Sequence, residues 1–258
     1  MDRVGRWLVI GLSLVQAALA IGFFVQAPAA VQLWPFEGTT SLTFIFVASI
    51  FAAAAASTLW VALRRDFGAL AGIGLDYLAI LIPVTVFGFR LGAERGDKAI
   101  TSFASVCALG ILYGVVLLLW SRRHPIDDRT TLPGPVRWSF LVFVIALIIL
   151  SGLLLAQVPN LIPWMITPTL SILIGWIFAG AAAYFIYGLI RPAWSNAAGQ
   201  LIGFLVYDLV LIVPFAVRLP AVADQFRLGL YLYTGFLVYS GLLAVYYLFV
   251  HRPTRVAG

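Results

Sequence analysis

Two aspartates are the residues of this chain whose surroundings most suggest chemistry. Asp76 and Asp208 each lie inside a long apolar run, with Tyr77 following the first and Tyr207 preceding the second. A carboxylate within a membrane span costs about 2.5–3.5 kcal/mol on insertion scales and is therefore a functional candidate. We expect Asp76, Tyr77, Tyr207 and Asp208 to form the candidate binding site for a substrate or an ion.

The sequence leaves several states open for these carboxyl groups. No Lys, Arg or His lies at the same depth in an apolar run, so neither aspartate has an intramembrane cation to pair with. Burial could keep both carboxyl groups protonated, or the two could share a proton across an interface. They could also line a wet cavity and bind a cation. The competing interpretation is structural: protonated side chains hydrogen-bonded to tyrosine or backbone that only hold helices together.

The stretch around Asp76 recurs around Asp208. Each copy has two glycines four residues apart, then the Asp and Tyr in either order, then five apolar residues and a proline. Glycines at this spacing share one helix face and allow close helix packing. The expected packing glycines are Gly68 and Gly72 in the first copy and Gly199 and Gly203 in the second, at a constant offset of 131 positions (199 − 68 and 203 − 72).

The composition identifies the class of protein that contains these runs. Of the 258 residues, 63% are hydrophobic and 10% are charged, whereas about a quarter of the residues in a soluble domain are charged. Apolar runs of eighteen or more residues are typical of membrane spans. We therefore expect an all-α integral membrane protein in contact with the lipid bilayer.

Eight such runs predict eight transmembrane helices, arranged as a tandem parallel repeat of two four-helix units. The first unit is expected over residues 1–125, a cytoplasmic linker over 126–135 and the second unit over 136–258. An even number of spans gives both units the same orientation, with the relating axis along the membrane normal. The spans are expected at residues 7–25, 41–63, 67–89, 100–120, 136–158, 168–190, 197–217 and 228–250.

The distribution of Lys and Arg predicts that both termini are cytoplasmic, because basic residues favour that side of a membrane. In this orientation eleven basic residues face the cytoplasm and five face the opposite side. The eleven are Arg3, Arg6, Arg64, Arg65, Arg122, Arg123, Arg129, Arg137, Arg191, Arg252 and Arg255; the five are Arg90, Arg95, Lys98, Arg218 and Arg227. We expect a multi-pass protein of the cell membrane.

Several functions are not expected from this sequence. It has no H-E-x-x-H, P-loop, G-x-S-x-G or Cys/His cluster, so we do not expect an enzyme. The basic residues lie singly or in pairs at span ends, without the stripe that nucleic acid requires. Cys107 is the single cysteine, and His124 and His251 lie at span ends, so no metal and no cofactor is expected.

Short motifs resemble those of a group of bacterial eight-span membrane proteins to which no activity is assigned. They are Leu33-Trp34-Pro35 with threonine a few residues on, a small-residue span ending at Arg64, and Arg191-Pro-Ala-Trp194. The group carries Leu-Trp-Pro-Trp, whereas this chain has Phe36 and then Glu37-Gly38. The resemblance implies an eight-span protein of the bacterial inner membrane and no particular activity.

The leading functional hypothesis is a small-molecule or ion- or proton-coupled transport protein with its site between the two units. The alternative is a structural or accessory subunit of a membrane complex, or a lipid-binding protein; the third is a membrane enzyme acting on lipid or quinone. Other membrane subunits or a second copy of the chain are the partners that these hypotheses allow. A cavity that reaches both Asp76 and Asp208 would favour transport, and a dry interface would favour the structural role.

Overall fold

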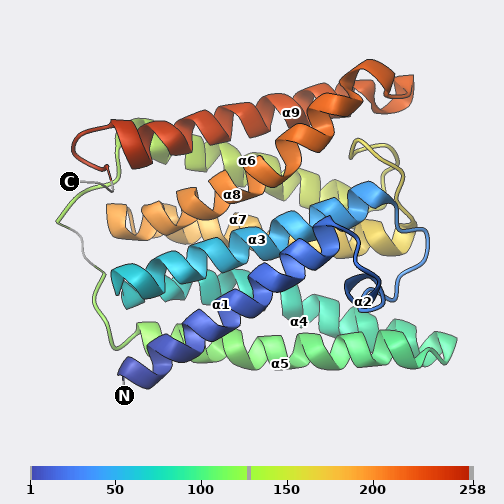
Figure 1. The fold of residues 1–258 in the computed structure, drawn as a ribbon, viewed down its shortest axis with the longest axis horizontal. Coiled ribbons are helices and arrows are strands. Elements are labelled where there is room, and N and C mark those ends of the chain that lie inside the picture. Colours follow the sequence, from blue (N-terminus) through green and yellow to red (C-terminus); the bar gives the residue numbers. More distant parts are fainter. Residues whose placement is uncertain (1, 127–128, 256–258) are drawn as a thin grey trace.

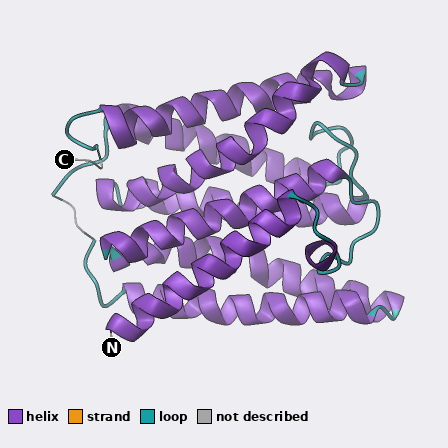
Figure 2. Ribbon diagram, in the orientation of Figure 1, coloured by secondary structure: helices purple, strands orange, loops and turns teal. Residues whose placement is uncertain are grey.

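The computed structural model describes residues 2–126 and 129–255, which form an all-α bundle (Figures 1 and 2). Eight helices in this part of the chain are long and apolar enough to cross a membrane, which confirms the expected number of spans. They are α1 (Asp2–Phe24), α3 (Ser41–Arg64), α4 (Leu70–Arg95), α5 (Lys98–Ser121), α6 (Gly134–Leu155), α7 (Pro168–Ile190), α8 (Trp194–Arg218) and α9 (Asp224–Val245). Short elements complete the fold: α2 (Pro28–Val31), the 3₁₀ turns η1 (Phe67–Ala69) and η2 (Leu219–Ala221), and the π turn η3 (Tyr246–Val250).

The helix ends follow local chemistry more closely than hydropathy. Helix α4 extends six residues beyond the expected end at residue 89. Its last turns include polar residues, so hydropathy placed the end of the span too early. The helix stops at Gly96, whose φ of +65° is a left-handed conformation that glycine adopts without strain. Helix α5 then begins where the Asp97 carboxylate accepts hydrogen bonds from the backbone N–H groups of Ala99 (2.7 Å) and Ile100 (3.2 Å).

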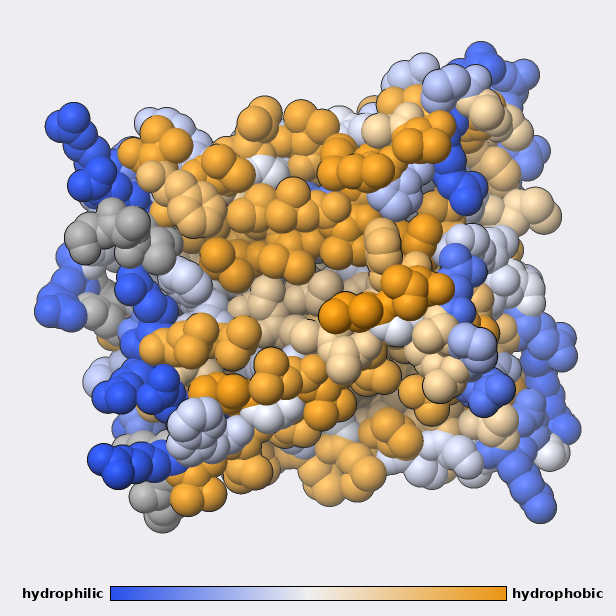
Figure 3. All heavy atoms as spheres, viewed as in Figure 1, coloured by the Kyte–Doolittle hydropathy of each residue, from blue (hydrophilic) through white to orange (hydrophobic). Residues whose placement is uncertain are grey.

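The surface of the bundle matches a lipid environment. Figure 3 shows hydrophilic residues gathered at the two ends and hydrophobic residues over the length between them. Large apolar side chains such as Leu109, Leu209 and Val217 are exposed on this belt. Helices of this kind satisfy their own backbone hydrogen bonds, as a bilayer requires. The chain is therefore a multi-pass membrane protein whose belt contacts lipid.

Helix α1 begins and helix α9 ends at the same end of the bundle (Figure 1). We call it the linker end, because the segment between α5 and α6 also runs there, and the opposite end the far end. Within the expected linker, residues 127–128 lie outside the described residues, as do Met1 and residues 256–258 of the two expected units. The rest of this segment pairs with the α7–α8 loop: the Leu132 N–H donates to the Pro192 carbonyl (2.9 Å), and the Trp194 N–H donates to the Thr130 carbonyl (2.8 Å).

The four inner helices of the bundle pack in pairs that join distant parts of the chain. Helix α3 lies along α8, and α4 lies along α7, whereas α3 and its sequence neighbour α4 have little contact. The outer helices cover this centre: α1 packs on α3, α5 on α4, α6 on α7 and α9 on α8. Neither half of the chain is therefore a closed four-helix bundle, and the interior lies between the halves.

Glycines set how closely these pairs approach. A methyl group at Gly203 of α8 would overlap Ser57 Oγ of α3 and lie 3.2 Å from the Ala53 carbonyl oxygen, and one at Gly72 of α4 would lie within 2.8 Å of the Tyr184 ring of α7. A methyl group at Gly68 would lie 2.9 Å from the backbone oxygen of Pro125. At Gly199 the nearest atoms would be 3.6 Å away, an ordinary contact. Of the four expected packing glycines, Gly199 alone has room for a methyl group.

We predict that Gly203→Ala destabilises the protein and that Gly199→Ala does not. Overpacking a tight interface costs about 1–3 kcal/mol, so the first variant should unfold at a lower temperature in detergent, measured by circular dichroism. The second is the matched control on the same face of α8 and should keep the wild-type midpoint. Adding Ser57→Ala to Gly203→Ala should recover part of the loss. Equal midpoints for both alanine variants would contradict this account of the α3–α8 contact.

Candidate functional site

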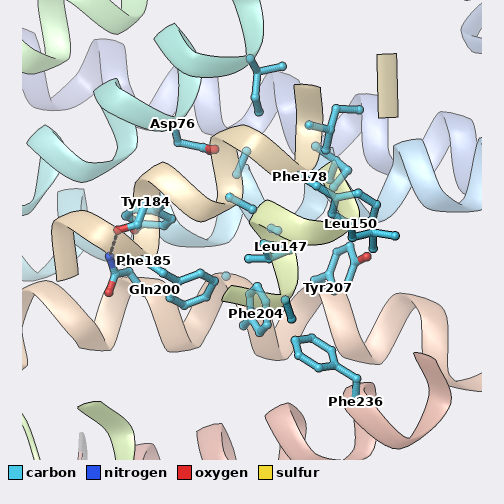
Figure 4. Close-up of a pocket in the computed structure, with 18 of the residues that line it drawn as sticks. Asp76, Leu147, Leu150, Phe178, Tyr184, Phe185, Gln200, Phe204, Tyr207 and Phe236 are labelled. Carbon is cyan, nitrogen blue, oxygen red and sulfur yellow. Dashed lines mark hydrogen bonds between the residues drawn. The ribbon is translucent and has the colours of Figure 1, made fainter. Parts of the chain in front are cut away.

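A cavity of about 400 Å³ lies at the centre of the bundle, enclosed by α3, α4, α6, α7, α8 and α9 (Figure 4). Most of its lining is apolar and aromatic, which is usual for a small-molecule site. Its helices come from both halves of the chain. The polar side chains on its wall are Ser57, Asp76, Tyr77, Tyr184, Gln200, Tyr207 and Tyr233.

Asp76 is the one carboxylic acid among the described residues on the wall of this cavity. It projects from α4 towards α7, where a methyl group at Gly180 would lie 2.7 Å from Asp76 Oδ1. The absence of a side chain at Gly180 therefore makes the space that the carboxyl group occupies. No described residue forms a hydrogen bond or an ion pair with Asp76. The cavity thus contains an acidic group whose bonding capacity is unused.

Neutral polar groups lie on the same side of the cavity as Asp76. Figure 4 shows Tyr184 and Gln200 there, with Leu150, Tyr207 and Phe236 on the opposite side. The Gln200 Nε2 group donates to the backbone oxygen of Tyr184 at 2.5 Å, while Gln200 Oε1 is buried without a partner in the described part of the chain. This polar side of the cavity offers hydrogen-bond acceptors and carries no basic group.

Tyr77 was predicted as a site residue from the sequence, whereas the groups around it were not. Tyr77 lines the cavity, and its hydroxyl accepts a hydrogen bond from Gln16 Nε2 of α1. Its ring also packs on Tyr113 of α5, with centroids 5.6 Å apart. Gln16 is conspicuous as a polar residue in an apolar run, and Gln200 lies between two packing glycines. Tyr184 carries no such signal, because tyrosine is common in spans.

Tyr207 occupies the apolar side of the cavity. Its hydroxyl is hydrogen-bonded to that of Tyr233 of α9, and its ring stacks on Phe204 at 5.9 Å. Tyr207 follows Asp76 by 131 positions, the offset of the two glycine motifs. The cavity-facing position therefore holds a carboxyl group in one half of the chain and a phenol in the other.

Asp208 does not line the cavity, so the expected cavity reaching both aspartates is not found, and the cavity reaches Asp76 alone. It is 3% exposed and faces α9, where a methyl group at Gly241 would lie 3.5 Å from Asp208 Oδ2. Both of its carboxyl oxygens lack a hydrogen-bond partner among the described residues. The four expected site residues thus divide: Asp76, Tyr77 and Tyr207 share the cavity, and Asp208 belongs to the α8–α9 contact.

The chemistry available at this site is that of one carboxyl group in an aromatic chamber. In the described ranges, no three His, Cys, Asp or Glu side chains gather as metal ligands. No protein-family model, curated protein or solved structure matches the chain.

We predict that a hydrophobic carbodiimide modifies Asp76 and spares Asp208. Dicyclohexylcarbodiimide reacts with protonated carboxyl groups that it can reach from the bilayer, and the cavity gives it space beside Asp76. Asp208 is enclosed by helix contacts. Peptide mass spectrometry of the treated protein should find the adduct on the α4 peptide, and Asp76→Asn should remove it. Modification of Asp208 at an equal or greater rate would contradict this assignment.

Proposed function

We propose that the protein is a membrane transport protein that binds a small molecule in the cavity between its halves. The observation that carries this proposal is the unpartnered carboxyl group of Asp76 on the wall of a mid-membrane cavity of about 400 Å³. An ionisable residue within a span that faces a cavity is characteristic of substrate and ion pathways. A site between the two halves of a chain is also where many transporters bind substrate near the membrane midplane.

Asp76 supplies a means of coupling in this proposal. A carboxyl group in apolar surroundings is most stable when it is neutral or paired with a cation. The neighbouring polar groups on the wall, Tyr77, Tyr184 and Gln200, are uncharged and cannot serve as that cation. Asp76 can therefore hold a proton or a cationic ligand, one at a time, and binding of one releases the other.

Packing argues against a purely structural role for Asp76. Protein interiors are close-packed, and an unfilled cavity costs stability. A carboxyl group that only joined helices would lie in a filled interface, as Asp208 does between α8 and α9. The filled contact around Asp208 fits a packing role without the expected hydrogen bonds, since neither of its oxygens has a partner among the described residues, and the open space beside Asp76 fits a binding role.

The tandem repeat is part of the same proposal. Helices α1, α3, α4 and α5 correspond in order to α6, α7, α8 and α9. Each packing pair has a counterpart under this correspondence: α1–α3 with α6–α7, α4–α5 with α8–α9, and α3–α8 with α7–α4. The offset of 131 between the glycine motifs supports the same assignment. Two parallel four-span units that exchange their inner helices would place the cavity near their common axis.

We predict that a bound small molecule copurifies with the protein and depends on the cavity. Native mass spectrometry of the protein purified from its own cells should detect the added mass in the wild type. Ala181→Phe places a ring in the cavity and should remove it, and Asp76→Asn should reduce it. Ile186→Phe, on the same helix but away from the cavity, is the matched control and should retain it. A wild type without added mass, or an Ala181→Phe variant that keeps it, would refute the proposal.

The proposed orientation places the linker end in the cytoplasm, because eleven of the sixteen basic residues belong to that end. In a Cys107→Ser background, we predict that a cysteine replacing Glu94 reacts with a membrane-impermeant thiol reagent on intact cells. A cysteine replacing Arg252 should react only after the membrane is permeabilised. Both positions are exposed, so access to the reagent decides the result. The reverse pattern would invert the topology.

A further inference from the structure

Helices α6 and α9 are neighbours on the outside of the bundle, yet their backbones do not pack along most of their length. Side chains bridge them towards the linker end. The Phe143 and Phe236 rings lie 4.9 Å apart, and the hydroxyl groups of Ser139 and Tyr239 lie within hydrogen-bond distance at 2.7 Å. This bridge closes the space between α6 and α9 on one side.

The loop between α6 and α7 closes the same space towards the far end. A methyl group at Gly229 of α9 would lie 3.5 Å from the Leu161 carbonyl oxygen of that loop. Between the two closures, Ala146 of α6 and Leu232 of α9 both line the cavity, and both are exposed. Leu232 is 66% exposed. We call this opening between α6 and α9 the lateral window.

The lateral window lies within the apolar belt and away from the aqueous ends. Ala146 follows the start of α6 by twelve residues, or about 18 Å of helix, and Leu232 follows the start of α9 by eight residues, or about 12 Å. Their lipid-facing neighbours Ile145, Ile149 and Leu228 are large, apolar and exposed. A molecule that passes through this window must therefore already be dissolved in the bilayer.

The wall of the cavity indicates the charge of such a molecule. Eight aromatic side chains surround the space, and their ring faces attract cations. They are Tyr77, Phe178, Tyr184, Phe185, Phe204, Tyr207, Phe236 and Tyr233. Among the described residues that line the cavity, Asp76 is the single carboxylic acid, and none is Lys, Arg or His. An anion would find no counter-charge there, whereas a hydrophobic cation would find both a carboxylate and aromatic faces.

We infer that the ligand is a hydrophobic cation that enters from the bilayer through the lateral window between α6 and α9. This inference rests on the proposed function, since it names the ligand class and the route for the same cavity. The charged part of the ligand lies against Asp76, beside Tyr184 and Gln200, and its apolar part lies towards Leu150 and Leu232. The ligand thus reaches the carboxyl group without crossing either aqueous end.

The charge of the ligand is tested with two ions of the same shape and opposite charge, tetraphenylphosphonium and tetraphenylborate. The protein is placed in nanodiscs of phosphatidylcholine, and binding is measured by equilibrium dialysis. Tetraphenylphosphonium should bind, and Asp76→Asn should weaken it about tenfold, the loss of about 1.4 kcal/mol; Asp208→Asn should leave it unchanged. Equal binding of the two ions, no binding of the phosphonium, or an unaffected Asp76→Asn variant would overturn the ligand class.

The route is tested by the rate at which tetraphenylphosphonium loads and leaves the cavity. Ala146→Trp fills the lateral window and should slow both steps several-fold. Leu232→Trp is a second variant of the same window. Ile149→Trp, exposed on the same helix outside the window, should load at the wild-type rate. Wild-type rates in both window variants would overturn the route, while copurification of a cavity-dependent small molecule would still support the proposed function.

Discussion

The close approach of α3 to α8 is the contact on which the rest of the bundle depends. Lipid gives helices little hydrophobic reason to associate, so close backbone packing and polar bonds decide which pairs form. Gly203 lets α8 reach the Ser57 side chain of α3, and Ser57 Oγ donates to the Gly199 carbonyl at 2.9 Å. Because α3 and α8 belong to different halves, this contact interlocks them. The α4–α7 pair at Gly72 does the same on the other side of the interior.

The cavity follows from the same small residues. Ala53, Ala54 and Ala181 allow helices to approach, but their side chains are too short to fill the space between neighbouring helices, and all three line the cavity. The rings of Phe185 and Tyr207 bound this space without filling it. The same helices therefore explain both the tight packing and the open interior. Small residues allow the helices to approach, and aromatic residues one turn further along the helix keep them apart.

The sequence was sufficient for the class and the number of spans, since composition and apolar runs are local properties of the chain. It was insufficient to predict that Asp76 lines the cavity and Asp208 does not. Asp76 continues the line of Gly68 and Gly72, whereas Asp208 is one position off the line of Gly199 and Gly203, about 100° round the helix. The packing of α3 against α8 decides which face of α8 points to the other half of the chain. That packing depends on contacts between residues more than a hundred positions apart, such as Ser57 and Gly199. The contribution of Tyr184 was hidden for the same reason.

In the proposed tandem repeat, Asp and Tyr exchange places between the two motifs, and this affects how many ions the cavity can bind. Two identical four-span subunits around an axis would direct either two carboxyl groups or none into the shared chamber. Two would repel each other once ionised and would favour a divalent load, and none would leave the chamber inert. In the proposed tandem repeat the two units are joined in one polypeptide, which removes that restriction because each copy can diverge independently. A cavity with Asp76 on one wall and Tyr207 on the other offers one carboxyl group among its described lining residues, and under the proposed function it would bind one monovalent cation per molecule.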